Sequence, residues 1–224
     1  MDYVAVVLAT LTVIMVLIVA AIVAVFLALR RLWRKTKPGQ TVARGLIVAL
    51  GLGIIASCYV GLKINERNFV LARVPAPLDV AEIEYRQEEL WGLGFMPGDN
   101  ETGLVVYRLT DKSAEWARSK GNQLPDALLG EQQVWAQTPV ADKDDEWGFQ
   151  ETYDPKTGRT SDRAPPDISG FLGKFGFDIE VEDVLQNEVN KAVQSPGSFY
   201  SYGSGGSVTI VDPANGKVYF AYAG

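Results

Sequence analysis

The sequence predicts a two-helix transmembrane hairpin followed by an α+β extracytoplasmic domain with a mainly antiparallel sheet. Two long uncharged apolar runs lie within residues 1–62. The charge then changes sign, because residues 1–62 hold one acidic and six basic side chains, whereas residues 63–224 hold 26 acidic and 15 basic ones. Short strand-like and helix-like runs, separated by turn signals, occupy the acidic part. These observations divide the chain into a membrane part and a folded domain.

The two apolar runs are long enough to cross a bilayer. Residues 4–29 form 26 positions and residues 45–62 form 18 positions without a charged side chain, and a spanning helix needs roughly 20. Both runs are apolar on all sides, which is typical of helices surrounded by lipid. We expect both helices to be retained, because the N-terminus lacks the basic segment of a cleavable secretory signal.

The loop between the two runs, residues 30–44, sets the expected orientation. It carries all six basic side chains of the membrane part and no acidic one. Basic loops stay in the cytoplasm, so the N-terminus and the large domain are expected on the other side. In a bacterial cell the chain is therefore predicted to be an integral inner-membrane protein, with its N-terminus and C-terminal domain in the periplasm.

Small side chains recur every four residues on the second run. They lie at Gly45, Ala49, Gly53, Ser57 and Gly61, and the first run offers the same spacing at Ala20, Ala24 and Ala28. Small residues let helix backbones approach closely in lipid, where hydrophobicity does not drive helices together. We predict that this small-residue face packs against the first helix or against another subunit, and the sequence leaves both choices open.

The end of the second run offers an alternative. The segment Ile55-Ala56-Ser57-Cys58 follows a basic and then apolar stretch, and it resembles a bacterial lipobox. A mature lipoprotein usually turns polar after the lipidated cysteine, whereas residues 59–62 stay apolar. An uncleaved helix is therefore the favoured interpretation, with Cys58 as a small buried apolar side chain.

The rest of the chain is predicted to comprise a linker over residues 63–77, stiffened by Pro75 and Pro77, and a domain over residues 78–224. Alternation over residues 79–86 indicates a strand, with a helix as the alternative. Further strands are expected at 104–109, 131–137, 207–211 and 217–222, and helices at 111–120 and 181–193. Two Asp-Pro-x-x-Gly segments, residues 154–158 and 212–216, are typical of hairpin turns and favour antiparallel pairing.

The composition excludes several catalytic and metal chemistries. The chain has no histidine and one cysteine, so Cys/His zinc sites and His-dependent catalysis are excluded. The acidic run 142–146 lacks the glycine and glutamate of an EF-hand calcium loop, and no histidine exists to activate Ser204 or Ser207. The sequence predicts no catalytic residue, no cofactor, no cofactor-binding residue and no metal ligand. The negative charge argues against nucleic acid as a partner.

These observations predict a membrane-anchored, non-enzymatic accessory or assembly protein. Its extracytoplasmic domain is expected to bind a protein partner or an envelope component, and its helices to contact the lipid bilayer and other membrane helices or a membrane complex. The alternative is a membrane-tethered envelope enzyme or carbohydrate-binding module that uses carboxylates and tryptophans. Its best candidates are Glu88 and Glu89 beside Trp91, although neighbouring side chains on a strand point to opposite faces.

Overall fold

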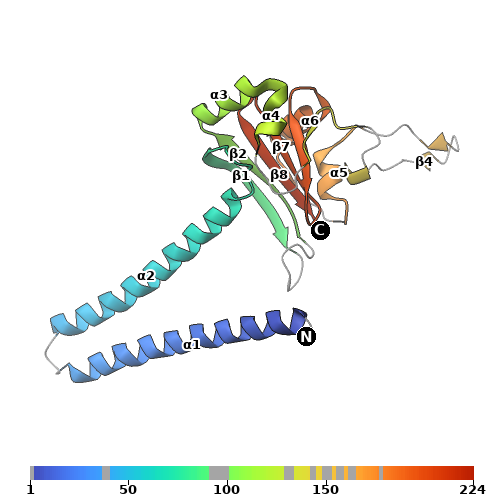
Figure 1. The fold of residues 1–224 in the computed structure, drawn as a ribbon. Coiled ribbons are helices and arrows are strands. Elements are labelled where there is room, and N and C mark those ends of the chain that lie inside the picture. Colours follow the sequence, from blue (N-terminus) through green and yellow to red (C-terminus); the bar gives the residue numbers. More distant parts are fainter. Residues whose placement is uncertain are drawn as a thin grey trace. The chain divides into compact units, whose positions relative to one another are not determined.

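A computed structural model gives the structure of the chain (Figure 1). It forms two compact units, Met1–Asn68 and Phe69–Gly224. The structure describes residues 3–36, 41–90, 101–128, 134–141, 145–147, 153–154, 159–160, 165–176 and 179–224.

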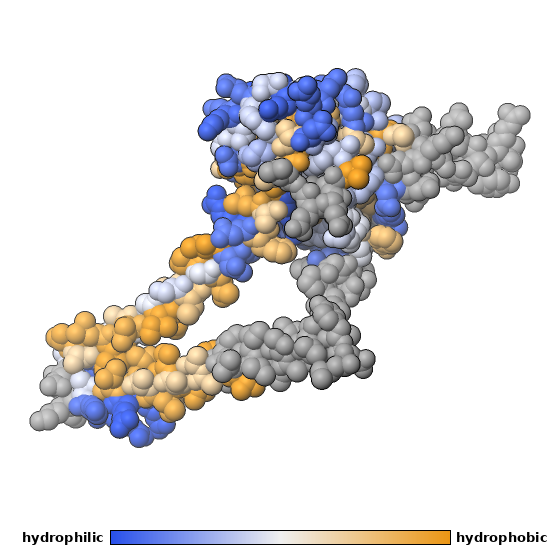
Figure 2. Space-filling model, in the orientation of Figure 1, coloured by the Kyte–Doolittle hydropathy of each residue, from blue (hydrophilic) through white to orange (hydrophobic). Residues whose placement is uncertain are grey.

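The first unit consists of the helix α1, Tyr3–Lys35, and most of the helix α2, Thr41–Leu71. In the described part of the chain, α2 is the one helix found to be long and apolar enough to cross a membrane. Many large apolar side chains of α2 are exposed, and they are visible along the face of the helix that Figure 2 shows, as expected of a helix that faces lipid. A second spanning helix, and with it the hairpin, stays a prediction.

The domain is built on a six-stranded sheet in the order β1-β2-β8-β7-β6-β3. Every neighbouring pair is antiparallel, which confirms the predicted α+β domain with a mainly antiparallel sheet. The strands are β1 Val80–Leu90, β2 Glu101–Leu109, β3 Ala136–Gln137, β6 Phe199–Gly203, β7 Ser207–Asp212 and β8 Lys217–Ala223. A separate two-stranded hairpin pairs β4, Tyr153–Asp154, with β5, Arg159–Thr160.

Helices cover both faces of the six-stranded sheet (Figure 1). One face packs against α3 (Asp111–Lys120), α4 (Leu124–Ala127) and the last turn of α2, and the other against α5 (Ile168–Leu172) and α6 (Asp183–Gln194). The interior strand β2 shows the consequence, because Val105 and Tyr107 enter the core on the α3 side while Leu104 and Val106 enter the core on the α6 side. A strand buried on both faces is apolar throughout rather than alternating.

Local sequence signals explain the ends of α3 and the turn between β7 and β8. The Thr110 side chain accepts a hydrogen bond from the Ser113 backbone N–H, and the helix ends at Gly121, whose φ is 51°. In the turn, the Asp212 carboxylate accepts from the Asn215 N–H at 3.1 Å, and Gly216 has φ 65°. The predicted helix at 111–120 and the strands at 104–109, 207–211 and 217–222 are confirmed, and the helix predicted at 181–193 is confirmed from Asp183 onwards.

Two strands differ from their predicted extents, and part of the acidic run lies outside the described residues. Residues 80–86 of the predicted segment 79–86 belong to a strand, and β1 continues to Leu90 because it pairs with β2 along its length. Of the strand predicted at 131–137, only β3 is a strand in the described residues. The start of the acidic run, residues 142–144, lies outside the described residues, and Asp145–Trp147 forms the short 3-10 helix η2.

Candidate functional site

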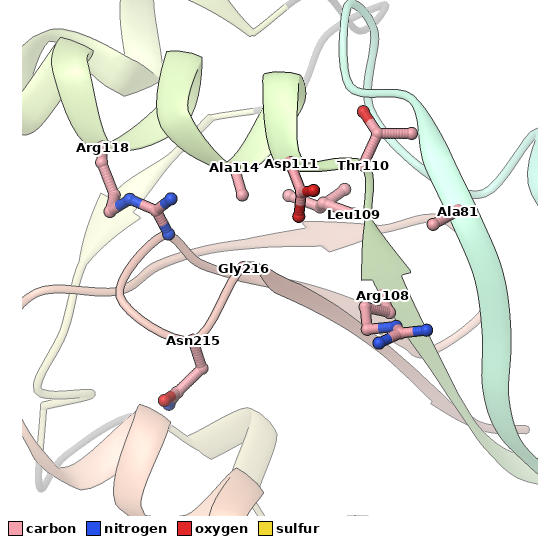
Figure 3. Close-up of a pocket in the computed structure, with 9 residues that line it drawn as sticks. All are labelled: Ala81, Arg108, Leu109, Thr110, Asp111, Ala114, Arg118, Asn215 and Gly216. Atoms are coloured by element: carbon pink, nitrogen blue, oxygen red, sulfur yellow. The ribbon is translucent and has the colours of Figure 1, made fainter.

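A recess of about 440 Å³ lies at one end of the sheet, between α3 and the β7–β8 turn (Figure 3). Its small apolar lining comes from Ala81, Leu109, Ala114 and Gly216, and its polar lining includes Arg108, Asp111, Arg118 and Asn215. A recess of this size falls within the range of small-molecule sites. We call it the α3 recess.

One face of α3 supplies most of the side chains that reach the α3 recess. Asp111, Ala114 and Arg118 are spaced three and four residues apart, so they lie on the same side of the helix. Figure 3 shows Asp111 between Arg118 and Arg108, with Thr110 turned away from the recess, in keeping with its capping role. The lining of the recess therefore includes one carboxylate and two guanidinium groups.

The β7–β8 turn closes the opposite side. Gly216 adopts a left-handed backbone conformation, which non-glycine residues other than Asn and Asp rarely adopt. A Cβ built at Gly216 would lie 3.1 Å from the Ala114 Cβ. The Arg118 Nη1 donates a hydrogen bond to the Pro213 carbonyl oxygen at 3.3 Å. Helix and turn thus approach closely, and glycine is needed where they meet.

The charged groups of the α3 recess differ in how far they are already paired. Arg108 forms an exposed ion pair with Glu82 on β1. Arg118 has five N–H donors, of which one contacts Pro213. Within the described part of the chain, the Asp111 carboxylate has neither a hydrogen bond nor an ion pair. Asp111 and most donors of Arg118 are therefore available to a ligand.

Glu88, a candidate carboxylate of the enzyme alternative, lies in a different environment. It accepts hydrogen bonds from Arg73 at 2.9 Å, from the Tyr222 hydroxyl at 3.0 Å and from Arg86. Burial raises the pKa of a carboxyl, but here these three donors outweigh burial and hold the pKa of Glu88 below its ordinary value. Glu88 is therefore ionised at neutral pH and is poorly suited to act as a general acid.

Arg73 completes this group, which we call the Arg73–Glu88 cluster. Its guanidinium stacks on the rings of Phe69, Phe220 and Tyr222 at 5.5, 4.9 and 5.1 Å. Next to it, the Tyr107 hydroxyl donates to the Val70 carbonyl at 2.7 Å. The cluster fastens the segment after α2 to β1, β2 and β8, which is a structural role.

A second polar cluster lies on the other face of the sheet. Lys217 pairs with Glu84 at 2.7 Å and with Glu188 at 2.9 Å, and the Tyr219 hydroxyl donates to Glu188 at 2.9 Å. Burial lowers the pKa of a lysine, but the two carboxylates outweigh it and raise the pKa of Lys217. Lys217 stays protonated and cannot serve as a base for Ser204 or Ser207 at neutral pH.

An acidic recess of about 460 Å³ lies beside β1. Tyr85 and Gln87 of β1 face Glu180, Glu182 and Asp183 there, and no lysine or arginine lines it. In the described residues, no group of three or more His, Cys, Asp and Glu side chains is arranged to hold a metal ion. The acidic recess is therefore a concave part of the surface with a concentrated negative charge.

The tryptophans in the described part of the domain lie on both faces of the sheet. Trp147 is 2% exposed, packs on Phe171 at 5.1 Å and donates its N–H to the Tyr202 hydroxyl at 2.7 Å. Trp116 and Trp135 pack on the opposite face of the sheet, and Trp91 lies outside the described residues. The described tryptophans thus form no common platform for a sugar ring.

The predicted small-residue face lies on α2 and α1 with much of it open. No described atom lies within 4 Å of a Cβ built at Gly45, Gly53 or Gly61, whereas Gly51 faces Leu29 of α1 at 3.6 Å. Ala49, Ala20, Ala24 and Ala28 line the same helices, and the Ser57 hydroxyl donates to the Gly53 carbonyl at 2.8 Å. Packing on this face therefore stays a prediction.

No protein-family profile, curated protein or solved structure matches this chain. A function for this chain is therefore inferred from its own sequence and structure. Sequence reasoning does not single out the α3 recess, because its residues come from β1, β2, α3 and the β7–β8 turn. The one local signal is the spacing of Asp111, Ala114 and Arg118 on a single helix face.

Proposed function

We propose that this chain is a membrane-anchored, non-enzymatic accessory or assembly protein whose extracytoplasmic domain binds a partner. One observation carries the proposal. The helix α2, which is apolar and long enough to cross a membrane, is continuous as far as Leu71, and Val70 in its last turn is 1% exposed within the domain core. The apolar segment and the first buried residues of the domain therefore belong to one helix, which is expected if the segment stays in the protein as a permanent membrane anchor.

The anchor in this proposal is a hairpin. Here α1 crosses the membrane as well, and the basic residues between the two apolar runs keep their connection in the cytoplasm. Both the N-terminus and the domain then lie in the periplasm of a bacterial cell. The open faces at Gly45, Gly53 and Gly61 are the surfaces on which further membrane helices pack.

The domain in this proposal works by binding. The absence of histidine from the chain leaves a serine without its usual base, and Glu88 and Lys217 are held by partners within the fold. The α3 recess and the acidic recess are two polar concave surfaces that the described part of the domain offers to a partner. Basic or dipolar groups on a protein or envelope component fit these surfaces.

Crosslinking in cells tests the proposal. The full chain, carrying a photo-reactive residue in place of Leu50, is irradiated in cells, purified in mild detergent and identified by mass spectrometry with its adducts. We expect a defined membrane-protein adduct that Gly53→Ile weakens and Leu52→Ile leaves unchanged, because Leu52 is already large and exposed. A chain that stays monomeric and forms no adduct from position 50 contradicts the proposal.

A further inference from the structure

We propose that the α3 recess binds a small zwitterion, a molecule that carries one carboxylate and one ammonium group. The inference rests on the proposed function of the domain as a binding module and names the chemical class of its ligand. It follows from the charges and the shape of the recess.

The α3 recess is lined by a negative and a positive side chain from one face of α3, Asp111 near the start of the helix and Arg118 near its end. Arg118 presents a guanidinium with most of its donors open, and a guanidinium is the side chain best suited to hold a carboxylate through two parallel hydrogen bonds. Asp111 presents an unpaired carboxylate within the described structure, which attracts an ammonium group. A simple anion would meet the Asp111 carboxylate and a simple cation would meet the Arg118 guanidinium, so a ligand with both charges fits best.

The spacing of these two groups sets the size of the ligand. Seven residues separate Asp111 from Arg118, which is about 10 Å along a helix axis. The Arg118 guanidinium is directed towards the β7–β8 turn, where it donates to the Pro213 carbonyl. A ligand that reaches both side chains therefore carries charges that are several bonds apart, as in a dipeptide or a γ-amino acid.

The floor of the recess accommodates the uncharged part of such a ligand. Ala81, Ala114 and Gly216 leave space because their side chains are small or absent. The volume of about 440 Å³ is sufficient for a molecule of this size. Ala81 is exposed on the edge strand β1, so a larger side chain at this position would fill the recess without entering the core.

Titration of the full-length protein in detergent with four probes tests the proposal. Glycylglycine carries both charges, N-acetylglycylglycine lacks the ammonium group, and glycylglycinamide lacks the carboxylate. The fourth probe, γ-aminobutyrate, is a zwitterion without a peptide bond. We expect glycylglycine to bind at least about tenfold more tightly than either blocked form, since a hydrogen-bonded charge contributes about that factor. Equal binding of γ-aminobutyrate assigns the site to amino acids in general, and weaker binding assigns it to peptides.

Three variants and two controls locate the binding. Arg118→Ala and Ala81→Phe are expected to weaken glycylglycine binding by about tenfold or more, and Asp111→Asn to remove the preference over N-acetylglycylglycine. Lys112→Ala and Glu115→Gln, exposed on the same helix outside the recess, are the matched controls. Ala81→Phe leaves the contact between Arg118 and Pro213 in place, so it reports on the recess even if Arg118→Ala disturbs the turn.

Two results overturn the inference. One is the absence of zwitterion binding to a folded wild-type protein, and the other is binding that Ala81→Phe and Arg118→Ala leave unchanged. Either result can occur while crosslinking still finds a membrane partner, in which case the proposed function stands and the ligand assignment fails. Zwitterion binding without a partner adduct would instead support the ligand assignment and contradict the proposed membrane partnership.

Discussion

The Arg73–Glu88 cluster gives the most quantitative prediction, for the variant Glu88→Ala. The Glu88 side chain is 15% exposed and that of Arg73 is 17% exposed. Removing the carboxylate leaves the Arg73 guanidinium stacked on aromatic rings without a counter-charge. Breaking a fully buried ion pair costs about 3–5 kcal/mol, and because this pair is partly solvated we expect a loss of about 2–3 kcal/mol in the free energy of unfolding.

The assay is thermal unfolding of the full-length protein in detergent, followed by near-ultraviolet circular dichroism of the domain. A domain of this size shifts its Tm by about 2–4 °C per kcal/mol, so Glu88→Ala is expected to lower the Tm by about 4–12 °C. Glu82→Ala is the matched control on the same strand. The Glu82–Arg108 pair is 54% and 57% exposed, and pairs of this kind contribute about 0–1 kcal/mol.

The comparison between the two variants tests whether the Arg73–Glu88 cluster stabilises the domain more than an exposed ion pair does. If Glu88→Ala and Glu82→Ala lower the Tm equally, the Arg73–Glu88 cluster does not fasten the segment after α2 to the sheet. If Glu88→Ala lowers the Tm while Arg73→Ala does not, Arg86 and Tyr222 alone account for the contribution of Glu88.

Three further predictions concern stability. Hydrogen bonds lower the pKa of Glu88 in the folded protein. The contribution of Glu88 to the free energy of unfolding is therefore fully present above the ordinary pKa of 4.5 and is lost as the pH falls through the lower folded pKa. The Tm of Glu88→Gln should depend less on pH below 4.5 than the Tm of the wild type. Thr110→Ala removes the cap of α3 and should reduce the unfolding free energy by about 1 kcal/mol, whereas the neighbouring Lys112→Ala should have little effect. Gly216→Ala places a Cβ at positive φ and near Ala114, so denaturant titration should show a loss of about 1–2 kcal/mol; an unchanged midpoint would mean that the turn relaxes freely.

The parts of the fold that the sequence predicts are those fixed by neighbouring residues. The cap at Thr110 and the stop at Gly121 define α3, and the Asp-Pro-x-x-Gly segment defines the β7–β8 turn. Residues 79–86 are ambiguous between strand and helix in the sequence because the choice depends on pairing with β2. The short extent of β3 likewise depends on its neighbour β6, since propensity alone does not set strand length.

The recess and the clusters are not predictable from local patterns, because they depend on contacts between distant parts of the chain. The α3 recess exists because β8 pairs with β2, which brings the turn at Gly216 beside Ala114. The Arg73–Glu88 cluster joins residues from the segment after α2, from β1 and from β8, and Glu88 and Tyr222 are 134 positions apart. Neither spacing leaves a periodic signal in the sequence.

Cysteine labelling of the membrane topology tests the central claim most directly. Cys58 is the chain's single cysteine, so Cys58→Ser gives a background for Ser119→Cys in the domain and Thr36→Cys at the end of α1. A membrane-impermeant maleimide is added to cells with a permeabilised outer membrane. We predict that the cysteine at 119 reacts at once and that the one at 36 reacts only after the inner membrane is broken. Reaction at 36 with protection at 119, or equal reaction at both, would contradict a membrane-anchored domain held outside the cytoplasm.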